Sequence, residues 1–341
     1  MLLSPSPHAC VKIALVKLII QIPCLNEADS LPTVLADLPV HIPGIDQIEI
    51  LVIDDGSTDG TGNAAAALGV HHIIRHKQWQ GLARAFQDGL DECLRQGADI
   101  IVNTDADNQY PAHYIADLVA PILRGEADIV IGDRQVQTIP HFSPLKKLFQ
   151  KAGSQVVRNI SGTTVPDAVS GFRAYSREAA LRLNILSRFS YTLETIIQAG
   201  KMGLTIVSVP IQTNQTERPS RLQKNMWHFM KAQASTILRV YAFYEPLRTF
   251  GYISLPFLLV GIGSWLRFFY FVLTEQSGVA RHTQSITIGS GLFVAGVLIL
   301  LFGIQADIAS KHRQLTQEML YRLKKREMGR NTEERGMEKE T

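Results

Sequence analysis

Two aspartates separated by one alanine, Asp105 and Asp107, are the residues of this 341-residue chain that most directly suggest chemistry. They follow an apolar run, residues 100–103, that predicts a buried strand. Carboxylate oxygens are ligands that hard divalent cations prefer, and water or substrate phosphate can complete the coordination. A cation held here would neutralise charge that develops on a diphosphate leaving group. Hydrated carboxylates in an acidic turn show the same spacing, so the pair alone leaves both interpretations open.

A second acidic segment, residues 54–59 with the sequence Asp-Asp-Gly-Ser-Thr-Asp, follows another apolar run. A carboxylate at this position can accept a hydrogen bond from a nucleobase N–H or a ribose hydroxyl. Asp and Ser are also the residues that cap helix N-termini, and a helix that begins near Thr61 would use them in that way. The segment therefore indicates either a nucleotide contact or a helix cap.

The elements that must position these residues alternate along the chain from Leu18 to Leu204. Short apolar runs are typical of strands and amphipathic segments of helices, which together predict an α/β fold with a mostly parallel sheet and helices on both faces. The expected strands cover residues 17–22, 49–53, 72–75, 100–104, 129–132 and 205–211. The expected helices cover residues 28–38, 61–68, 81–95 and 111–124. Ligands of such sheets bind beyond the carboxyl ends of the strands, where both acidic segments fall.

Residues 251–273 and 286–306 are each apolar over about the 20 residues that a helix needs to cross a bilayer. The loop between them holds one basic residue, Arg281, whereas several basic residues follow the second span. This asymmetry predicts an integral membrane protein whose catalytic domain and both termini are cytoplasmic. Small residues in the spans, such as Gly289 and Gly296, also suggest a possible homo-oligomer.

The predicted domains are an N-terminal extension (1–17), a catalytic domain (18–222), interfacial amphipathic helices (223–250), two transmembrane helices (251–306) and a basic cytoplasmic tail (307–341). Residues 223–250 carry apolar side chains at helical spacing, which an ordinary core-facing helix would also show. The formal net charge of +3 is too small to indicate a nucleic-acid partner. Three cysteines without metal-ligand spacing are expected to be reduced thiols.

Three motifs fall in order after successive predicted strands: residues 23–27 (Pro-Cys-Leu-Asn-Glu), 54–59, and 105–109 (Asp-Ala-Asp-Asn-Gln). Further motifs are Gly81-Leu82-Ala83-Arg84-Ala85, Gly132-Asp133-Arg134, Ser170-Gly171-Phe172-Arg173 and Leu193-Glu194. Over residues 18–222 the chain resembles family 2 glycosyltransferases, which have the Rossmann-like GT-A fold. With the membrane hairpin, the whole chain is similar to the polyisoprenyl-phosphate glycosyltransferase branch, which includes dolichyl-phosphate mannose synthases.

The resemblance implies a nucleotide pocket lined by Pro23, Leu25, Glu27, Asp54, Asp55, Gly81 and Asp105. It implies a site for Mg²⁺ or Mn²⁺ formed by Asp105, Asp107 and Gln109, with Asn108 standing where many relatives have Gly or Leu. Arg134 and Arg173 match arginines that hold phosphate groups, a task that suits a planar guanidinium.

Two further carboxylates, Asp167 and Glu194, match positions that organise the sugar or phosphate site or serve as a general base towards a hydroxyl acceptor. Glu194 as a simple helix-surface acid stays an alternative. Arg218 and Arg221 match a mobile basic loop that closes over donor and acceptor. A solvated charged loop is the alternative for that pair.

These features predict a metal-dependent, inverting enzyme of cell-envelope glycan synthesis. It would move one sugar from a nucleotide diphosphate, with UDP slightly preferred over GDP, to polyprenyl phosphate at the cytoplasmic face. Transfer to a glycolipid or glycan hydroxyl is the nearest alternative. A nucleotidyltransferase would begin with a glycine-rich phosphate loop where this chain has Pro23 to Glu27, and a catalytically silent scaffold would not bind a nucleotide diphosphate through Asp105 and Asp107.

Overall fold

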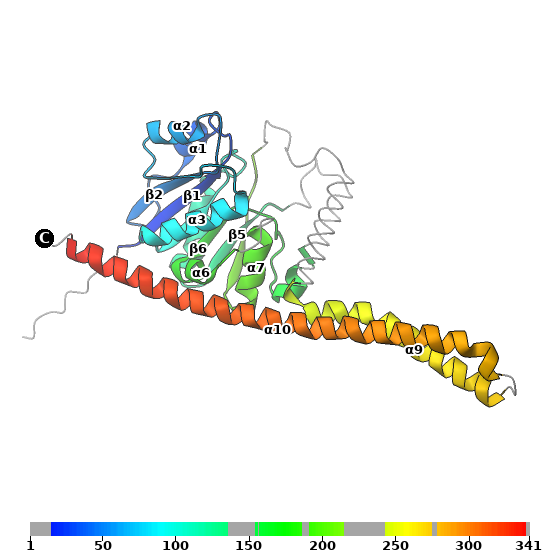
Figure 1. Ribbon diagram of the computed structural model, residues 1–341. Helices are drawn as coiled ribbons and strands as arrows, with labels where there is room; N and C mark the ends of the chain where they lie inside the picture. Colours follow the sequence, from blue (N-terminus) through cyan, green and yellow to red (C-terminus); the bar gives the residue numbers. More distant parts are fainter. Residues whose placement is uncertain are drawn as a thin grey trace, which may run out of the picture. The chain divides into compact units, whose positions relative to one another are not determined.

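The computed structural model describes residues 15–135, 154–155, 157–185, 191–214, 243–274 and 278–338. These residues form two compact units. One unit holds a sheet with its covering helices, and the other holds helix α9 and most of helix α10 (Figure 1).

The sheet has seven strands in the order β3-β2-β1-β4-β6-β5-β7. Their bounds are β1 Lys17–Cys24, β2 Gln47–Asp54, β3 His72–Arg75, β4 Ile100–Asn103, β5 Ile129–Asp133, β6 Arg173–Ser176 and β7 Ile206–Pro210. Strand β6 runs antiparallel to both of its neighbours, β4 and β5, and every other pairing is parallel. The mostly parallel sheet that the sequence predicts is therefore confirmed, with one antiparallel strand inserted in it.

The helices of this unit are α1 Leu31–Asp37, α2 Thr61–Ala67, α3 Leu82–Arg95, α4 Tyr114–Leu123, α6 Arg177–Arg182 and α7 Tyr191–Lys201. Helix α1 begins three residues later than the predicted range 28–38, and a proline stands in its first turn. Proline is favoured there because its missing N–H would have no helical partner. Helix α4 begins three residues after the predicted start at 111, because residues 111–113 form a preceding turn.

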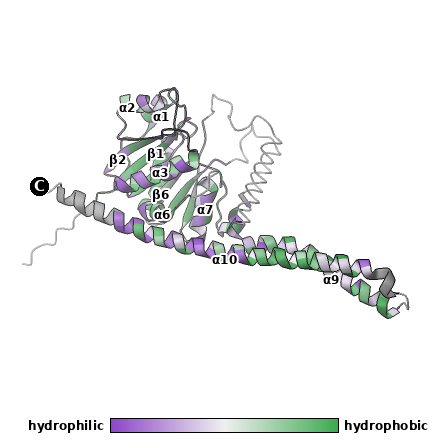
Figure 2. Ribbon diagram, in the orientation of Figure 1, coloured by the Kyte–Doolittle hydropathy of each residue, from purple (hydrophilic) through white to green (hydrophobic). Residues whose placement is uncertain are grey.

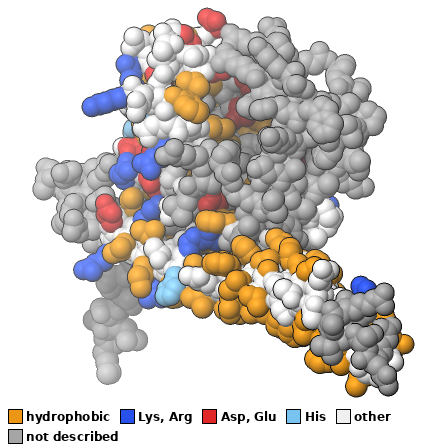
Figure 3. Space-filling model, turned by 45° about the vertical axis from the view of Figure 1, so that its right-hand side comes forward, with side chains coloured by type: hydrophobic (Ala, Val, Ile, Leu, Met, Phe, Trp, Pro, Cys, Tyr) orange, Lys and Arg blue, Asp and Glu red, His pale blue; other side chains and the backbone are white. Residues whose placement is uncertain are grey.

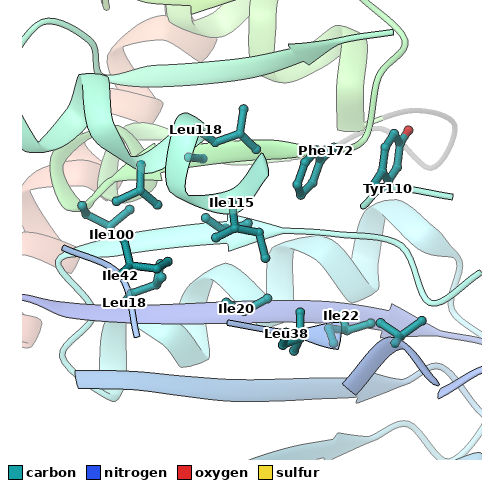
Figure 4. Packing of buried hydrophobic residues seen from close by; sticks show 14 of the residues in the cluster. Leu18, Ile20, Ile22, Leu38, Ile42, Ile100, Tyr110, Ile115, Leu118 and Phe172 are labelled. Atoms are coloured by element: carbon teal, nitrogen blue, oxygen red, sulfur yellow. The ribbon is translucent and has the colours of Figure 1, made fainter. Parts of the chain in front are cut away.

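Alternate residues of β1 point to opposite faces of the sheet, and helices cover both faces. Leu18, Ile20 and Ile22 are fully buried in the cluster that includes Ile115 and Leu118 of α4 (Figure 4). Burying each such side chain contributes about 1.5–3 kcal/mol. On the other face α3 packs against β1 and β2. The core thus holds β1 and β4 in fixed register, which places the segments after them side by side.

The second unit contains two long apolar helices, α9 Pro246–Thr274 and α10 Gly278–Glu338. Both are long and apolar enough to cross a membrane by length and composition, over Pro246–Thr274 and Thr283–Met328. Helix α10 does not end near residue 306 but continues as one helix, with its colouring changing from hydrophobic to hydrophilic along the way (Figure 2). Hydrophobic side chains dominate the visible surface of the paired helices (Figure 3).

A row of small residues lets α9 and α10 approach closely. Gly289, Gly296 and Gly303 recur every seven residues, and a Cβ on Gly296 would lie 2.8 Å from Leu258 Cδ2. A Cβ on Gly289 would lie 2.6 Å from Ser264 Cβ. A seven-residue repeat keeps one face of a helix against its partner. These glycines therefore serve packing within the hairpin, and a contact between chains stays a prediction.

Candidate active site

The segments that follow β1 and β2 are joined by hydrogen bonds into one surface. The backbone N–H of Asn26 donates to Ser57 Oγ (3.0 Å), and that of Thr58 donates to Asn26 Oδ1 (2.9 Å). Two further backbone N–H groups, of Glu27 and Ala28, donate to Thr61 Oγ1 and Asp59 Oδ2. The predicted nucleotide-pocket residues Leu25 and Glu27 lie on this surface half-buried, and Pro23 lies buried at the end of β1.

Asp55 is a buried carboxylate whose oxygens bind other parts of the chain. Oδ1 accepts from the N–H of Gln80 (2.9 Å) and lies 2.7 Å from His76 Nδ1, while Oδ2 accepts from the N–H of Gly81 (2.8 Å). The neighbouring Asp54 accepts from the N–H of Ser57 (2.9 Å), as a turn-capping aspartate does. Neither carboxylate caps helix α2, whose N-cap residue is Gly60 without a side-chain cap, so both hold loop backbone instead. A base contact by either residue stays a prediction.

Two glycines allow the loop after β3 to reach this surface. A Cβ on Gly56 would lie 2.6 Å from the backbone of Gln78 and Trp79, so a side chain there would push the loop away. Gly81, with φ +99°, adopts a conformation that L side chains rarely adopt. The backbone conformation at position 81 therefore accounts for the glycine without any contact to a ligand.

The two aspartates after β4 differ in their surroundings. Asp107 is exposed, and its Oδ1 accepts from the N–H of Gln109 (3.0 Å). Asp105 is half-buried, and in the described part of the chain no hydrogen bond reaches its carboxylate. Burial and the nearby charge of Asp107 raise the pKa of Asp105 to about 7, against the opposing effect of Arg134. A cation would relieve both unfavourable effects, so this pair fits a divalent ion.

A buried polar network that the sequence motifs did not reveal lies next to Asp105. Asn103 Nδ2 donates to the carbonyl of Gly171 (2.9 Å) and to Tyr191 Oη (3.1 Å). A Cβ on Gly171 would lie 3.3 Å from both carboxylate oxygens of Asp105. The same Cβ would lie 2.8 Å from Tyr191 Oη, so the glycine lets the segment before β6 pack closely against both side chains. The available signal was a polar residue, Asn103, at the end of an otherwise apolar strand.

Arg134 and Asp167, predicted as a phosphate contact and as a general base or site-organising acid, bind each other. Arg134 Nε and Nη2 donate to the two carboxylate oxygens of Asp167 at 2.7 and 3.1 Å. Burial lowers the pKa of Arg134, but the hydrogen-bonded Asp167 outweighs it and raises that pKa above its usual value. A carboxylate held in this way is poorly suited to accept a proton as a general base.

Arg173 is fully buried, which differs from the exposed phosphate contact that the sequence suggests. Its guanidinium donates to the carbonyls of Ser170, Thr192 and Ala168 and to the hydroxyl of Thr195. These contacts brace the start of β6 against α7. The geometry favours a supporting role over contact with a ligand.

Glu194 lies buried on α7 and accepts from Gln198 Nε2 (3.1 Å), so it is not a helix-surface acid. The backbone of Gln109 bonds both to Asp107 and to Asn214, which follows β7.

Arg218 and Arg221, and the predicted interfacial helix as far as residue 242, lie outside the described residues.

The donor set at Asp105 is small. Across the described ranges, no group of three or more His, Cys, Asp or Glu side chains that could hold a metal occurs. Among the described residues, the two carboxylates and the predicted amide of Gln109 are the candidate ligands, so a bound metal would also need oxygen atoms from water or a diphosphate. This is the donor set expected of a metal that binds together with its substrate.

Comparison with known proteins gives the class. Residues 19–183 match the family model "Glycosyl transferase family 2". A polyprenol monophosphomannose synthase of Mycolicibacterium smegmatis is 29% identical over 207 residues, which are 58% of this chain and 77% of the relative. A UDP-N-acetylglucosamine–dolichyl-phosphate N-acetylglucosaminyltransferase of Methanococcus voltae is 32% identical over 221 residues, 58% of this chain and 85% of the relative.

Among solved structures, glucosyl-3-phosphoglycerate synthase of Mycobacterium tuberculosis, in complex with Mn²⁺, UDP-glucose and phosphoglyceric acid, has the same fold. Its TM-score is 0.53 at 22% identity, over 67% of this chain and 79% of that one. The fold and the sequence matches define a GT-A glycosyltransferase. The chain belongs to glycosyl transferase family 2, in the branch of polyisoprenyl-phosphate glycosyltransferases.

Proposed function

We propose that this glycosyltransferase moves a single sugar from a nucleotide diphosphate to polyprenyl phosphate. The observation that carries the donor half is the half-buried Asp105, whose carboxylate has no hydrogen-bond donor in the described chain and stands beside Asp107. Such a pair suits a divalent cation bound with a diphosphate. Mg²⁺ and Mn²⁺ both fit these oxygen ligands, and glucosyl-3-phosphoglycerate synthase of M. tuberculosis has been solved with Mn²⁺ and UDP-glucose and with Mg²⁺ and UDP.

The acceptor half of the proposal rests on the helical hairpin and on the relatives. The relatives from M. smegmatis and M. voltae carry a polyprenol or dolichyl phosphate in their names. A lipid acceptor of this kind is held in a membrane, and α9 and α10 are long and apolar enough to enter one. Membrane anchoring would keep the enzyme beside its acceptor.

The proposed reaction does not need the protein to remove a proton from the acceptor. A phosphate acceptor is already anionic near pH 7, so the chain must position it and stabilise the departing nucleoside diphosphate. The pairing of Asp167 with Arg134 agrees with this, because it engages a carboxylate that was predicted as a possible base towards a hydroxyl acceptor. A bound metal, held by Asp105, Asp107 and Gln109, would supply charge neutralisation at the diphosphate. Single displacement by the phosphate oxygen gives inversion at the anomeric carbon.

The proposal includes a catalytic domain over residues 18–222, interfacial helices over 223–250, a membrane anchor over 251–306 and a cytoplasmic tail over 307–341. Both termini and the catalytic domain face the cytoplasm in this arrangement, because Lys and Arg gather outside the loop between the spans. A UDP-sugar is slightly preferred over a GDP-sugar as donor. Arg218 and Arg221 are proposed to meet the acceptor phosphate.

The test is incubation of the purified full-length enzyme with UDP- and GDP-sugars and undecaprenyl or dolichyl phosphate, followed by mass spectrometry of the lipid extract. We expect a lipid-linked monosaccharide that is lost in Asp105→Asn and Asp107→Asn and retained in the exposed-loop variant His41→Ala. Sugar on a glycolipid or glycan hydroxyl, with no lipid-phosphate product, would instead support the alternative acceptor.

A further inference from the structure

Trp79 stands out as a large aromatic side chain left exposed on an otherwise tightly held loop. Its exposed fraction is 67%, whereas Phe86, seven residues further along the chain, is fully buried. The loop holding Trp79 joins β3 to α3 and lies between two segments of the proposed nucleotide pocket, residues 54–57 and Gly81. A single exposed aromatic needs no explanation by itself, but its surroundings here are specific.

The backbone on both sides of Trp79 is fixed by contacts with the loop after β2. The N–H groups of Gln80 and Gly81 donate to the buried carboxylate of Asp55. The backbone of Gln78 and Trp79 packs against Gly56, where a Cβ would lie within 2.6 Å. The loop therefore has little freedom to carry Trp79 away from the pocket.

His76 anchors the start of the same loop. Its Nδ1 lies 2.7 Å from Asp55 Oδ1 and its Nε2 lies 3.2 Å from Asp88 Oδ2 on α3. The backbone N–H of His76 also donates to the carbonyl of Asp54. The imidazole thus binds Asp55, after β2, and lies beside Asp88 on α3, although its Nε2 makes no hydrogen bond among the described residues. The segment from His76 to Gly81 is held at both ends by Asp54 and Asp55, while the indole of Trp79 is exposed.

The indole lies on the Gly81 side of the loop. A Cβ on Gly81 would be 3.9 Å from Trp79 Cζ2, an ordinary van der Waals distance. The ring is therefore next to the glycine whose backbone is proposed to approach the nucleotide. An aromatic face held on a fixed backbone is the arrangement that stacks on a planar base at low entropic cost.

We infer that Trp79 is the residue that stacks on the nucleobase of the donor. The inference rests on the proposed function, since it needs the donor to be a nucleotide. It adds a residue that lies outside the acidic segments 54–59 and 105–109. Stacking on an aromatic side chain is tolerant of base type, because every base has a π-face. Trp79 then contributes affinity for the nucleoside, while hydrogen-bonding groups nearby must distinguish uracil from guanine.

The test measures binding of UDP and of GDP to the full-length protein with Mn²⁺ by isothermal titration calorimetry, in wild type, Trp79→Ala and Trp79→Phe. Trp79→Ala is expected to weaken nucleotide binding on the order of ten-fold, with Trp79→Phe closer to wild type. The matched control is Leu82→Ala, an exposed apolar residue on the other side of Gly81, which should bind as wild type does. Pyrophosphate, which has no base, should bind Trp79→Ala and wild type equally.

Tryptophan fluorescence supplies a second readout. Nucleotide should quench emission in wild type and in Trp265→Phe, a change within the hairpin, but not in Trp79→Phe. If wild type binds neither nucleotide, the proposed function fails. If wild type binds and Trp79→Ala binds equally well, the stacking inference alone is overturned. The stacking inference is also overturned if Trp79→Ala binds nucleotide as wild type does but binds anionic lipid vesicles more weakly. In that case Trp79 contacts the membrane.

Discussion

Arg134 and Asp167 form a two-point ion pair, with Nε and Nη2 donating to the two carboxylate oxygens, although 33 residues separate them in the chain. Their side chains are 12% and 6% exposed. The pair joins the end of β5 to the segment that leads into β6, beside the acidic residues that follow β4. The sequence predicted that each residue acts on the substrate by itself, whereas in the structure they bind each other.

Removing both members of this pair should cost less stability than the sum of the two single removals. Asp167→Ala leaves a nearly buried guanidinium without its partner, and such changes cost about 3–5 kcal/mol. The double change Arg134→Ala with Asp167→Ala removes the stranded charge, so its loss should be smaller than the sum of the single losses. Chemical unfolding of the four proteins measures this coupling. Additive losses would contradict it.

Metal affinity should depend on pH through Asp105. Its pKa of about 7 means that a proton competes with the metal below that pH. Mn²⁺ binding in the presence of UDP is expected to weaken as the pH falls from 8 to 6, approaching ten-fold per pH unit below the pKa. Calorimetric titration at pH 6, 7 and 8 measures the effect. An affinity that stays constant over this range would show that Asp105 ionises at its ordinary pKa.

The same shift makes a prediction about the metal-free protein. The folded state raises the pKa of Asp105 above its unfolded value near 4, so folding favours the protonated form. Ionised Asp105 therefore destabilises the fold as the pH rises from 4 through 7. Asp105→Asn should raise the thermal midpoint at pH 8 with chelator present, and the gain should vanish near pH 4. Asp107→Asn removes only the repulsive charge beside Asp105 and leaves its burial unchanged, so its gain should be smaller.

Loosening His76 should impair donor binding more than the chemical step. His76→Ala removes the imidazole that binds Asp55, the carboxylate that accepts from the N–H of Gly81, so the backbone at Gly81 loses part of its support. The KM for the nucleotide sugar is expected to rise several-fold with a smaller change in kcat. Steady-state kinetics of His76→Ala, His76→Gln and the exposed-loop control His41→Ala test this. A fall in kcat at unchanged KM would assign His76 a different role.

The glycine row of the hairpin can be tested with two substitutions on one helix. Gly296→Leu places atoms where Leu258 already lies, whereas nothing lies within 4 Å of a Cβ on Gly291. Overpacking typically costs about 1–3 kcal/mol. Gly296→Leu should therefore lower the unfolding temperature in detergent, and Gly291→Leu should leave it near that of wild type. If Gly291→Leu instead splits an oligomer on size exclusion, the open glycine mediates contact between chains.

Sequence patterns predicted the parallel part of the sheet because its strands are apolar runs that end at polar motifs. They missed β6, whose residues Arg-Ala-Tyr-Ser form no apolar run. That strand is stable because β4 and β5 flank it and because Arg173 donates to the carbonyls of Ala168 and, on α7, Thr192. No local pattern encodes such contacts, so the burial of Arg173 could not be predicted.

At the acidic site, too, contacts between residues close in sequence were predictable and contacts between distant segments were not. The spacing of Asp105 and Asp107 predicted which carboxylates would come together at a strand end, because chain neighbours stay neighbours. The ion pair of Arg134 with Asp167 and the packing of Gly171 against Asp105 depend on segments that approach only in the folded protein. Residue types and spacing therefore predicted where these carboxylates lie better than they predicted the partner of each side chain.

The hydrogen bonds between the segments after β1 and β2 have an evolutionary consequence. Because the protein itself holds these segments in shape, a change of donor need not remodel any backbone. New sugar or base preferences can then arise through single side-chain replacements on an unchanged frame. Related enzymes with different donors should accordingly superimpose closely in these two segments and diverge in the side chains that project from them.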